Sequence, residues 1–136
     1  MVPFQVKGLD HVVLRVADLQ RALDFYREVI GGTIEREQTS IGLTQLRIGA
    51  SLIDLIPLDG QLGQIGGAGP GREGRNLDHF AIQVTPFDAP AIRAHLERHG
   101  VAVAAAGQRY GAEGDGPSIY ITDPDGNTVE LKGPPG

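Results

Sequence analysis

The sequence predicts an α+β fold of two tandem modules, each with a strand, a helix and then further strands. Two stretches carry this prediction: residues 9–32 read LDHVVLRVADLQRALDFYREVIGG, and residues 77–100 read LDHFAIQVTPFDAPAIRAHLERHG. In both, a strand-like apolar run is followed by apolar residues at helical spacing, and the helix pattern ends at glycine. An internal repeat of this kind predicts that the two halves share one architecture.

The first module is expected to span about residues 7–59. Its first strand is predicted at 9–16, and the helix after it begins at the N-cap residue Asp18. Residues 43–49 and 51–57 read as two strands joined by a tight turn. This half is therefore a strand and a helix followed by two or three strands.

The second module is expected at about residues 76–133, and with the first it forms a single domain over residues 1–136. Its predicted elements are a strand at 77–84, a helix at about 88–99, and strands at 101–107, 117–122 and 127–132. The sequence DPDG at 123–126 has proline and glycine where a hairpin turn between the last two strands needs them.

Two features resemble functional motifs but are better explained as structural. Residues 60–75 contain seven glycines, yet they lack the Gly-Lys-Ser/Thr ending of a phosphate-binding loop, and a strand pattern follows. A flexible linker is the preferred interpretation. His95 and His99 have the i, i+4 spacing of a helical zinc site, but no glutamate follows His95 directly, so a structural role is expected.

Each module begins with a histidine and ends in a strand that carries a carboxylate. His11 corresponds to His79, and the strand around Asp54 overlays the strand around Glu130 at a slightly larger offset. The longer segment 107–116 of the second half accounts for the difference in offset. Taken singly, each of these residues is compatible with an ordinary strand position, but the recurrence of the whole pattern favours a shared site.

The chemistry of these residues points to a metal. Two imidazole nitrogens and one or two carboxylate oxygens form a good site for a borderline divalent cation. His11 and Glu130 lie in apolar surroundings, where an unsatisfied imidazole or carboxylate would be costly. We therefore expect His11, His79 and Glu130 to be metal ligands, with Asp54 as a further ligand, either directly or through water.

Composition excludes several other classes. The chain has no cysteine, so disulfides, thiolate nucleophiles and Cys-type zinc sites are impossible. The net charge of −5 and the lack of a Lys/Arg run argue against nucleic acid or an anionic membrane as partner. No apolar run approaches membrane-spanning length, and the start MVPFQVKG lacks a signal-peptide core, so a soluble cytoplasmic protein is expected.

The stretches 9–32 and 77–84, together with IYITDPDGNTVEL at 119–131, resemble the vicinal oxygen chelate superfamily. This superfamily includes glyoxalase I, fosfomycin-resistance proteins, extradiol dioxygenases, methylmalonyl-CoA epimerase and bleomycin-resistance proteins. The resemblance implies two tandem βαβββ modules that form a cupped mixed β-sheet, usually completed in a homodimer whose subunits share each metal site. The ending GPSIYITDPDGNTVEL is most similar to short glyoxalase-I-like proteins.

The resemblance also assigns roles to residues. It implies that His11, His79 and Glu130 occupy metal-ligand positions for Ni, Zn, Co, Mn or Fe, and that Asp54 falls where glyoxalase I has its remaining ligand. Expected substrate-binding residues are Arg15 and Arg75, which match glutathione-contacting positions, and Arg109 and Tyr110, from a mobile loop at 107–116 that would close over the substrate.

The leading functional hypothesis is a glyoxalase-like lyase or isomerase acting on a small molecule, possibly a thiol adduct. The metal would hold two neighbouring substrate oxygens and stabilise an enediolate as a Lewis acid, while Glu130 or Asp54 moves the proton. An apolar cavity lined by Val13, Leu52 and Ile56 would exclude water.

Three alternatives stay open. An extradiol-type Fe(II) dioxygenase would use the same two histidines and one carboxylate. Fosfomycin-type thiol transfer ranks lower, because no matching potassium-binding loop is recognisable. A metal-free binding protein of the bleomycin-resistance type is a different class, and the presence of His11, His79 and Glu130 speaks against it.

Overall fold

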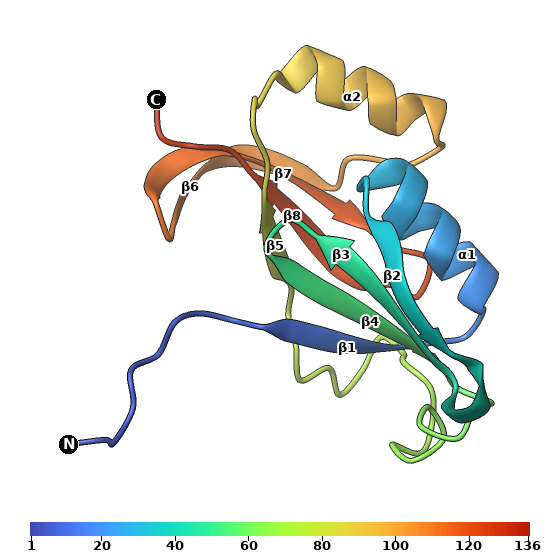
Figure 1. The fold of residues 1–136 in the computed structure, drawn as a ribbon. Helices are drawn as coiled ribbons and strands as arrows, with labels where there is room; N and C mark the ends of the chain where they lie inside the picture. The colour runs from blue at the N-terminus through green and yellow to red at the C-terminus, as the bar shows by residue number, and fades with distance from the viewer. The chain divides into compact units, whose positions relative to one another are not determined.

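The computed structural model describes all 136 residues, and the chain divides into two compact units, residues 1–69 and 70–136. The division falls inside the glycine-rich segment that follows the first repeat. Each unit is one module with its own helix and its own four-stranded sheet (Figure 1). None of the helices has the length and apolar character that crossing a membrane requires.

The first unit has the element order strand, helix and three strands. Its elements are β1 (His11–Val16), α1 (Leu19–Asp24), a π-helical continuation (Phe25–Val29), β2 (Thr33–Gln38), a 3₁₀ turn (Thr39–Ile41), β3 (Leu43–Ile48) and β4 (Ser51–Pro57). The sheet order is β1-β4-β3-β2, with β1 parallel to β4 and the other neighbours antiparallel. The expected helix is therefore present, but its second half is π-helical.

The two faces of this sheet differ in chemistry. Because side chains alternate along a strand, Leu14, Val16 and Leu55 share the face against which α1 packs, and all three are buried (Figure 1). His11 and Asp54 belong to the opposite face, since β1 and β4 run parallel with His11 paired to Leu52. The helix therefore covers one face of the sheet, and His11 and Asp54 belong to the other.

The second unit repeats this topology. Its elements are β5 (Phe80–Gln83), α2 (Ala89–Arg98), β6 (Ala105–Gly111), β7 (Gly114–Thr122) and β8 (Thr128–Lys132). The sheet order is β5-β8-β7-β6, again with the first and last strands parallel. Buried Ile119, Ile121, Val129 and Leu131 form its core. The prediction of an α+β fold with two βαβββ modules is confirmed.

The segment 107–116 is not the mobile loop that the sequence suggested. It forms a β-hairpin in which β6 pairs with β7 from Ala105 opposite Tyr120 to Gly111 opposite Gly114. Gly114 has φ +109°, a conformation that an L side chain rarely adopts, and this allows the tight turn. The high glycine and polar content of this segment hid its strand pattern, because residues 108–116 depend on pairing rather than on an alternating apolar sequence.

Candidate metal and substrate site

The structure brings His79 and Glu130 into contact within the second module. In the parallel pair of β5 and β8, Ala81 lies opposite Glu130, and His79 precedes Ala81 by two residues on the same face. His79 Nε2 lies 3.1 Å from Glu130 Oε1, and Glu130 is only 6% exposed. The register of two strands therefore aims a histidine and a buried carboxylate at one point.

Neighbouring strand residues hold the Glu130 carboxylate in place. Ser118 Oγ donates a hydrogen bond of 2.6 Å to Glu130 Oε2, and the Tyr120 hydroxyl is also hydrogen-bonded to this carboxylate. Burial raises the pKa of Glu130, but the hydrogen bonds from Ser118 and Tyr120 and the nearby His79 outweigh burial and lower its pKa from 4.5. Glu130 is therefore a carboxylate at neutral pH.

The His79 ring is held from its other side by the residue before it. His79 Nδ1 lies 2.8 Å from Asp78 Oδ2, and this hydrogen bond is the main cause of a raised His79 pKa, with a further contribution from the charge of Glu130. Alternation along a strand suggests that Asp78 points away from His79. The Asp78 carboxylate nevertheless turns onto the ring, because Asp78 lies two residues before β5 and is not held by the pairing of β5 with β8.

The first module contains the same arrangement in outline. Val13 lies opposite Asp54 in the parallel pair of β1 and β4, and His11 precedes Val13 by two residues. His11 Nδ1 lies 2.7 Å from Asp10 Oδ2, so Asp10, like Asp78, contacts the histidine that follows it. The hydrogen bond to Asp10 is the main cause of a raised His11 pKa, and the charge of Asp54 adds to it.

Asp54 is buried beside a cross-strand amide. It is 4% exposed, and Gln45 Nε2, from the residue directly opposite on β3, lies 3.3 Å from each of its carboxylate oxygens. The structure contains no group of three or more His, Asp or Glu side chains arranged to hold a metal ion. Each module therefore supplies a half-site of one histidine and one buried carboxylate.

Arg15 and Arg75, both expected to contact substrate, bind backbone carbonyls of their own units. Arg15 donates to the carbonyl oxygens of Gly63, Gly67 and Ala68 at 2.8, 2.5 and 3.1 Å. Arg75 donates from Nε to Gly71 at 2.8 Å and from a terminal nitrogen to Gly126, in the turn that leads into β8. The first part of the glycine-rich segment is therefore tied to the first module by Arg15.

Arg109 and Tyr110 occupy opposite faces of β6. The Arg109 guanidinium lies 5.5 Å from the centre of the Tyr120 ring, and that ring meets His79 edge-on with a centroid distance of 5.5 Å. Burial is the main cause of a raised Tyr120 pKa, and the hydrogen bond to Glu130 adds to it while Arg109 opposes it. Arg109 therefore joins the half-site through Tyr120, whereas Tyr110 is 82% exposed and lies on the other face.

Sequence reasoning missed Ser118 and Tyr120. Tyr120 lies directly opposite Glu130 in the antiparallel pair of β7 and β8, and Ser118 lies two residues away on the same face. The alternation of polar and apolar residues in PSIYIT was a usable signal. It identifies the polar face of β7, but the partners on that face depend on strand register.

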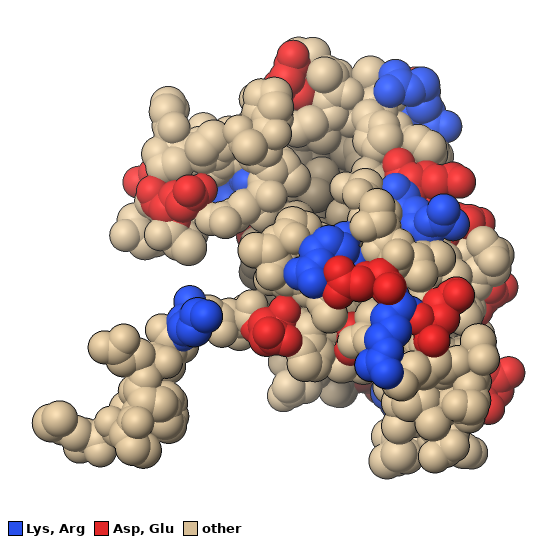
Figure 2. Space-filling model, viewed as in Figure 1, with Lys and Arg blue, Asp and Glu red and all other residues tan.

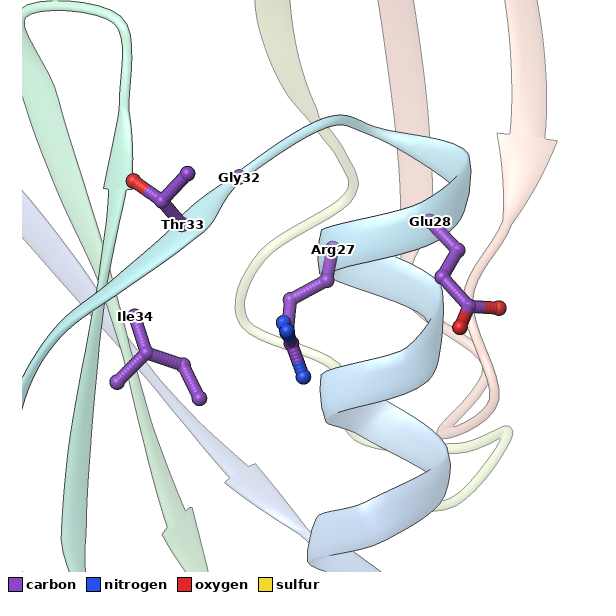
Figure 3. Close-up of a pocket in the computed structure, with 5 residues that line it drawn as sticks. All are labelled: Arg27, Glu28, Gly32, Thr33 and Ile34. Atoms are coloured by element: carbon purple, nitrogen blue, oxygen red, sulfur yellow. The ribbon is translucent and has the colours of Figure 1, made fainter.

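The expected cavity residues Val13, Leu52 and Ile56 share the face of the first sheet that carries Asp54. Ile56 is buried, whereas Val13 is 48% exposed. A pocket of about 430 Å³ lies elsewhere in this unit, lined by Arg27, Glu28, Gly32, Thr33 and Ile34 (Figure 3). It lies between the end of the helical segment and β2, and none of the predicted ligands lines it.

Acidic and basic side chains lie close together on the surface. Figure 2 shows them in small mixed groups, consistent with the net charge of −5. The Arg47–Glu35 ion pair between β3 and β2, at 2.8 Å, is one such group. At the C-terminal end of α2, the rings of His95 and of the C-cap residue His99 contact one another edge-to-face with centroids 4.7 Å apart.

Residues 8–131 match the Glyoxalase/Bleomycin resistance protein/Dioxygenase superfamily, and the chain belongs to this family. It is 32% identical over 127 residues to the glyoxalase domain-containing protein RDO1 of Mycosarcoma maydis, covering 93% of this chain and 68% of RDO1. It is 29% identical over 127 residues to glutathione transferase FosA of Serratia marcescens, covering 93% and 80%.

A solved structure supports the same assignment. The crystal structure of virulence protein STM3117 from Salmonella typhimurium matches with a TM-score of 0.74 and 25% identity, covering 97% of this chain and all of the other. The family that the sequence motifs indicated is thus confirmed. Membership of the family does not by itself define the activity of this chain, which depends on the side chains of the site.

The donor atoms of the second half-site fit a divalent cation. Two ligand atoms bound to one cation at about 2.1 Å lie about 3.0 to 3.4 Å from one another. His79 Nε2 and Glu130 Oε1 are 3.1 Å apart, within that range. When the neutral ring donates its hydrogen from Nδ1 to Asp78, Nε2 faces the carboxylate with a lone pair, and a proton or a cation between the two satisfies both atoms.

Proposed function

We propose that this protein is a metal-dependent lyase or isomerase of the glyoxalase type, acting on a small substrate with two neighbouring oxygens. The observation that carries the proposal is the contact between His79 Nε2 and Glu130 Oε1 at 3.1 Å, with Asp78 and Ser118 holding the two side chains from behind. These two atoms are a preformed pair of donors: one imidazole nitrogen and one oxygen of a carboxylate that is ionised at neutral pH.

The proposed ligand set is His79 and Glu130 from the second module with His11 and Asp54 from the first. One histidine and one carboxylate come from equivalent strand positions of each module. In a homodimer, half-sites from two copies of the chain would complete one another. This N/O donor set suits Ni, Zn, Co, Mn or Fe.

The carboxylates of Glu130 and Asp54 would have different roles. When bound, the cation would supply Lewis-acid stabilisation of charge that develops on neighbouring substrate oxygens. Glu130 accepts hydrogen bonds from Ser118 and Tyr120, which fix its direction and suit a ligand. Asp54 is held by a single amide group at 3.3 Å, which leaves its lone pairs available to take a proton from substrate carbon and return it.

The substrate would carry a negative group, such as the carboxylates of a thiol adduct. Arg109 lies beside Tyr120, whose hydroxyl contacts Glu130, so a cationic side chain adjoins the proposed ligand pair. A guanidinium binds carboxylates and phosphates through paired hydrogen bonds. A glutathione adduct of an α-ketoaldehyde is the first substrate to test.

The decisive experiment is metal analysis of protein purified without added metal, beside the His79→Ala and His11→Ala/Glu130→Ala variants. We expect a stoichiometric divalent metal in the wild type and its loss in both variants. Equal, negligible metal in all three, also after incubation with Ni²⁺, Zn²⁺, Co²⁺, Mn²⁺ and Fe²⁺, would overturn the proposal. If metal binds, isomerisation of a methylglyoxal–glutathione adduct tests the chemistry, and oxygen uptake with catechols tests the dioxygenase alternative.

A second candidate is transfer of a thiol to a small anionic electrophile. The glutathione transferase FosA relative supports it, and so does the position of Arg109 beside Tyr120. The discriminating measurement is the consumption of free glutathione in the presence of a phosphonate epoxide. Consumption that depends on His79 would favour transfer, and isomerisation of a preformed adduct without net loss of glutathione would favour the lyase.

A further inference from the structure

We infer that Asp10 and Asp78 are positioning residues that hold His11 and His79 in the Nδ1–H tautomer and so turn the Nε2 lone pair of each ring toward the metal. The inference rests on the proposed function, because it names what orients two of the proposed ligands. It assigns a role to the aspartate that directly precedes the histidine of each module.

The same contact occurs independently in two modules. His11 Nδ1 lies 2.7 Å from Asp10 Oδ2, and His79 Nδ1 lies 2.8 Å from Asp78 Oδ2. The two carboxylates are 89% and 98% exposed, so neither aspartate contributes to a core. Burial therefore does not explain why an Asp–His pair occurs in both modules, whereas a shared role of the two histidines as metal ligands does.

The chemistry of the pair determines which nitrogen is free. An ionised aspartate only accepts hydrogen bonds, and a neutral imidazole has a single N–H. Asp10 therefore favours the hydrogen on Nδ1 of His11 and leaves Nε2 as the electron-pair donor. At His79 the Glu130 carboxylate lies 3.1 Å from Nε2 and competes for the same hydrogen, so Asp78 shifts the balance toward Nδ1–H, and a cation between Nε2 and Glu130 completes the shift. A carboxylate behind a metal-binding histidine fixes the tautomer and ring orientation and makes the ligand more basic.

The two rings differ in how much else restrains them. His79 Nε2 contacts Glu130, and the His79 ring meets Tyr120 edge-on. His11 is more exposed, with 45% of its side chain accessible against 36% for His79. Loss of Asp10 should therefore disturb its histidine more than loss of Asp78 does.

Imidazole ¹⁵N NMR of the metal-free full chain tests the inference, at a pH above both imidazole pKa values. The wild type should show the Nδ1–H tautomer at His11 and a mixture of both tautomers at His79, where Glu130 competes for the hydrogen. Asp78→Ala should shift the His79 ring toward the Nε2–H tautomer, and Asp10→Ala should do the same for the His11 ring. The shift at His11 should be the larger of the two. Asp78→Asn keeps an acceptor and should give an intermediate shift. Asp115→Ala, which removes an exposed aspartate from β7, is the charge-matched control and should change neither ring.

Calorimetric titration with Ni²⁺ or Zn²⁺ supplies the second readout. Each alanine variant should bind about tenfold more weakly than wild type, within the range that such partners contribute, while Asp115→Ala binds like wild type. A wild-type His11 ring in the Nε2–H form, or rings unchanged in both alanine variants, would overturn the inference. The tautomer needs no metal, so a tautomer shift in a chain that binds no metal would refute the proposed function and leave the positioning role standing.

Discussion

His79 Nε2 lies 3.1 Å from Glu130 Oε1 although 51 residues separate the two in sequence. The parallel pairing of β5 with β8 causes this contact, because it sets Ala81 opposite Glu130 and leaves His79 two residues upstream on the same face. The first module places Asp54 opposite Val13 by the same register, again two residues after a histidine. Five predictions follow from the contacts around these positions.

Metal should stabilise the fold, and a chelator should remove the effect. A ligand that binds the native state raises the free energy of unfolding by about 2.7 kcal/mol at a concentration of 100 times its Kd. We expect Ni²⁺ or Zn²⁺ to raise the Tm of the wild type and EDTA to reverse the rise. His79→Ala should show no rise in Tm, whereas His99→Ala, at the C-cap of α2, should respond like wild type. An equal rise in Tm in both variants would show that the metal binds at another site.

Ser118→Ala should destabilise the protein. The substitution removes the 2.6 Å donor to Glu130 Oε2 and leaves a buried carboxylate oxygen less satisfied. The expected loss is about 1 to 3 kcal/mol in the free energy of unfolding, measured by urea denaturation. Ser51→Ala removes an exposed hydroxyl whose 3.3 Å bond to the Leu9 carbonyl faces water, and it should cost much less. Equal losses of stability in the two variants would contradict a particular stabilising role for the Ser118–Glu130 hydrogen bond.

Stability of the metal-free protein should fall as the pH rises past neutrality. The His79 pKa is raised from 6.5, chiefly by the hydrogen bond to Asp78, so the folded state binds the proton more tightly than the unfolded state. The resulting stabilisation is complete below pH 6.5 and is lost as the pH rises through the folded-state pKa. Urea midpoints measured across this range should show the fall in wild type and a flatter profile in His79→Gln. A profile that rises with pH in both would contradict the pairing.

Arg15→Ala should loosen the segment that contains Gly63, Gly67 and Ala68. The guanidinium is bonded to all three of these carbonyl oxygens, so its removal frees the backbone there. Faster hydrogen exchange and easier proteolysis should appear at residues 63–68. Arg72→Ala, in the same glycine-rich stretch, is the control for loss of charge. Unchanged protection in Arg15→Ala would mean that other contacts hold the segment.

Gly63→Ala should be strongly destabilising, whereas Gly71→Ala should be nearly neutral. A Cβ at position 63 would lie 1.8 Å from the Pro57 carbonyl oxygen, so the backbone has to move, but a Cβ at 71 meets nothing within 4 Å. Overpacking of this kind costs about 1 to 3 kcal/mol. Denaturation curves of the two variants form a matched pair. Similar midpoints would show that the chain near Gly63 does not pack on the end of β4.

Much of the fold was readable because its signals are local. The histidine strand, the Asp18 N-cap and the repeated helix pattern lie within short windows, and Asp18 does accept a hydrogen bond from Arg21 N–H at 3.1 Å. Within the hairpin of β6 and β7, residues 108–116 were missed as strand, since they carry no apolar alternation and their pairing is decided by the strands around them.

The candidate site was readable in part for the same reason. The histidines and carboxylates stand out because they recur in two modules, and their role as ligands stays a prediction. Ser118 and Tyr120 were not named, because register alone decides which residues of β7 lie beside Glu130. Arg15 was predicted to bind the substrate, but in the structure its guanidinium donates hydrogen bonds to backbone carbonyls.

The sequence by itself determined the two-module architecture, the family, and the four residues with metal-binding chemistry, since composition, periodicity and repetition need no coordinates. Only the tertiary structure decided that His79 and Glu130 touch, that Asp10 and Asp78 turn back onto the histidines after them, and that Tyr120 links Arg109 to the carboxylate. These relationships arise from strand register and from loop paths, which depend on packing and hydrogen bonds between segments far apart in the chain.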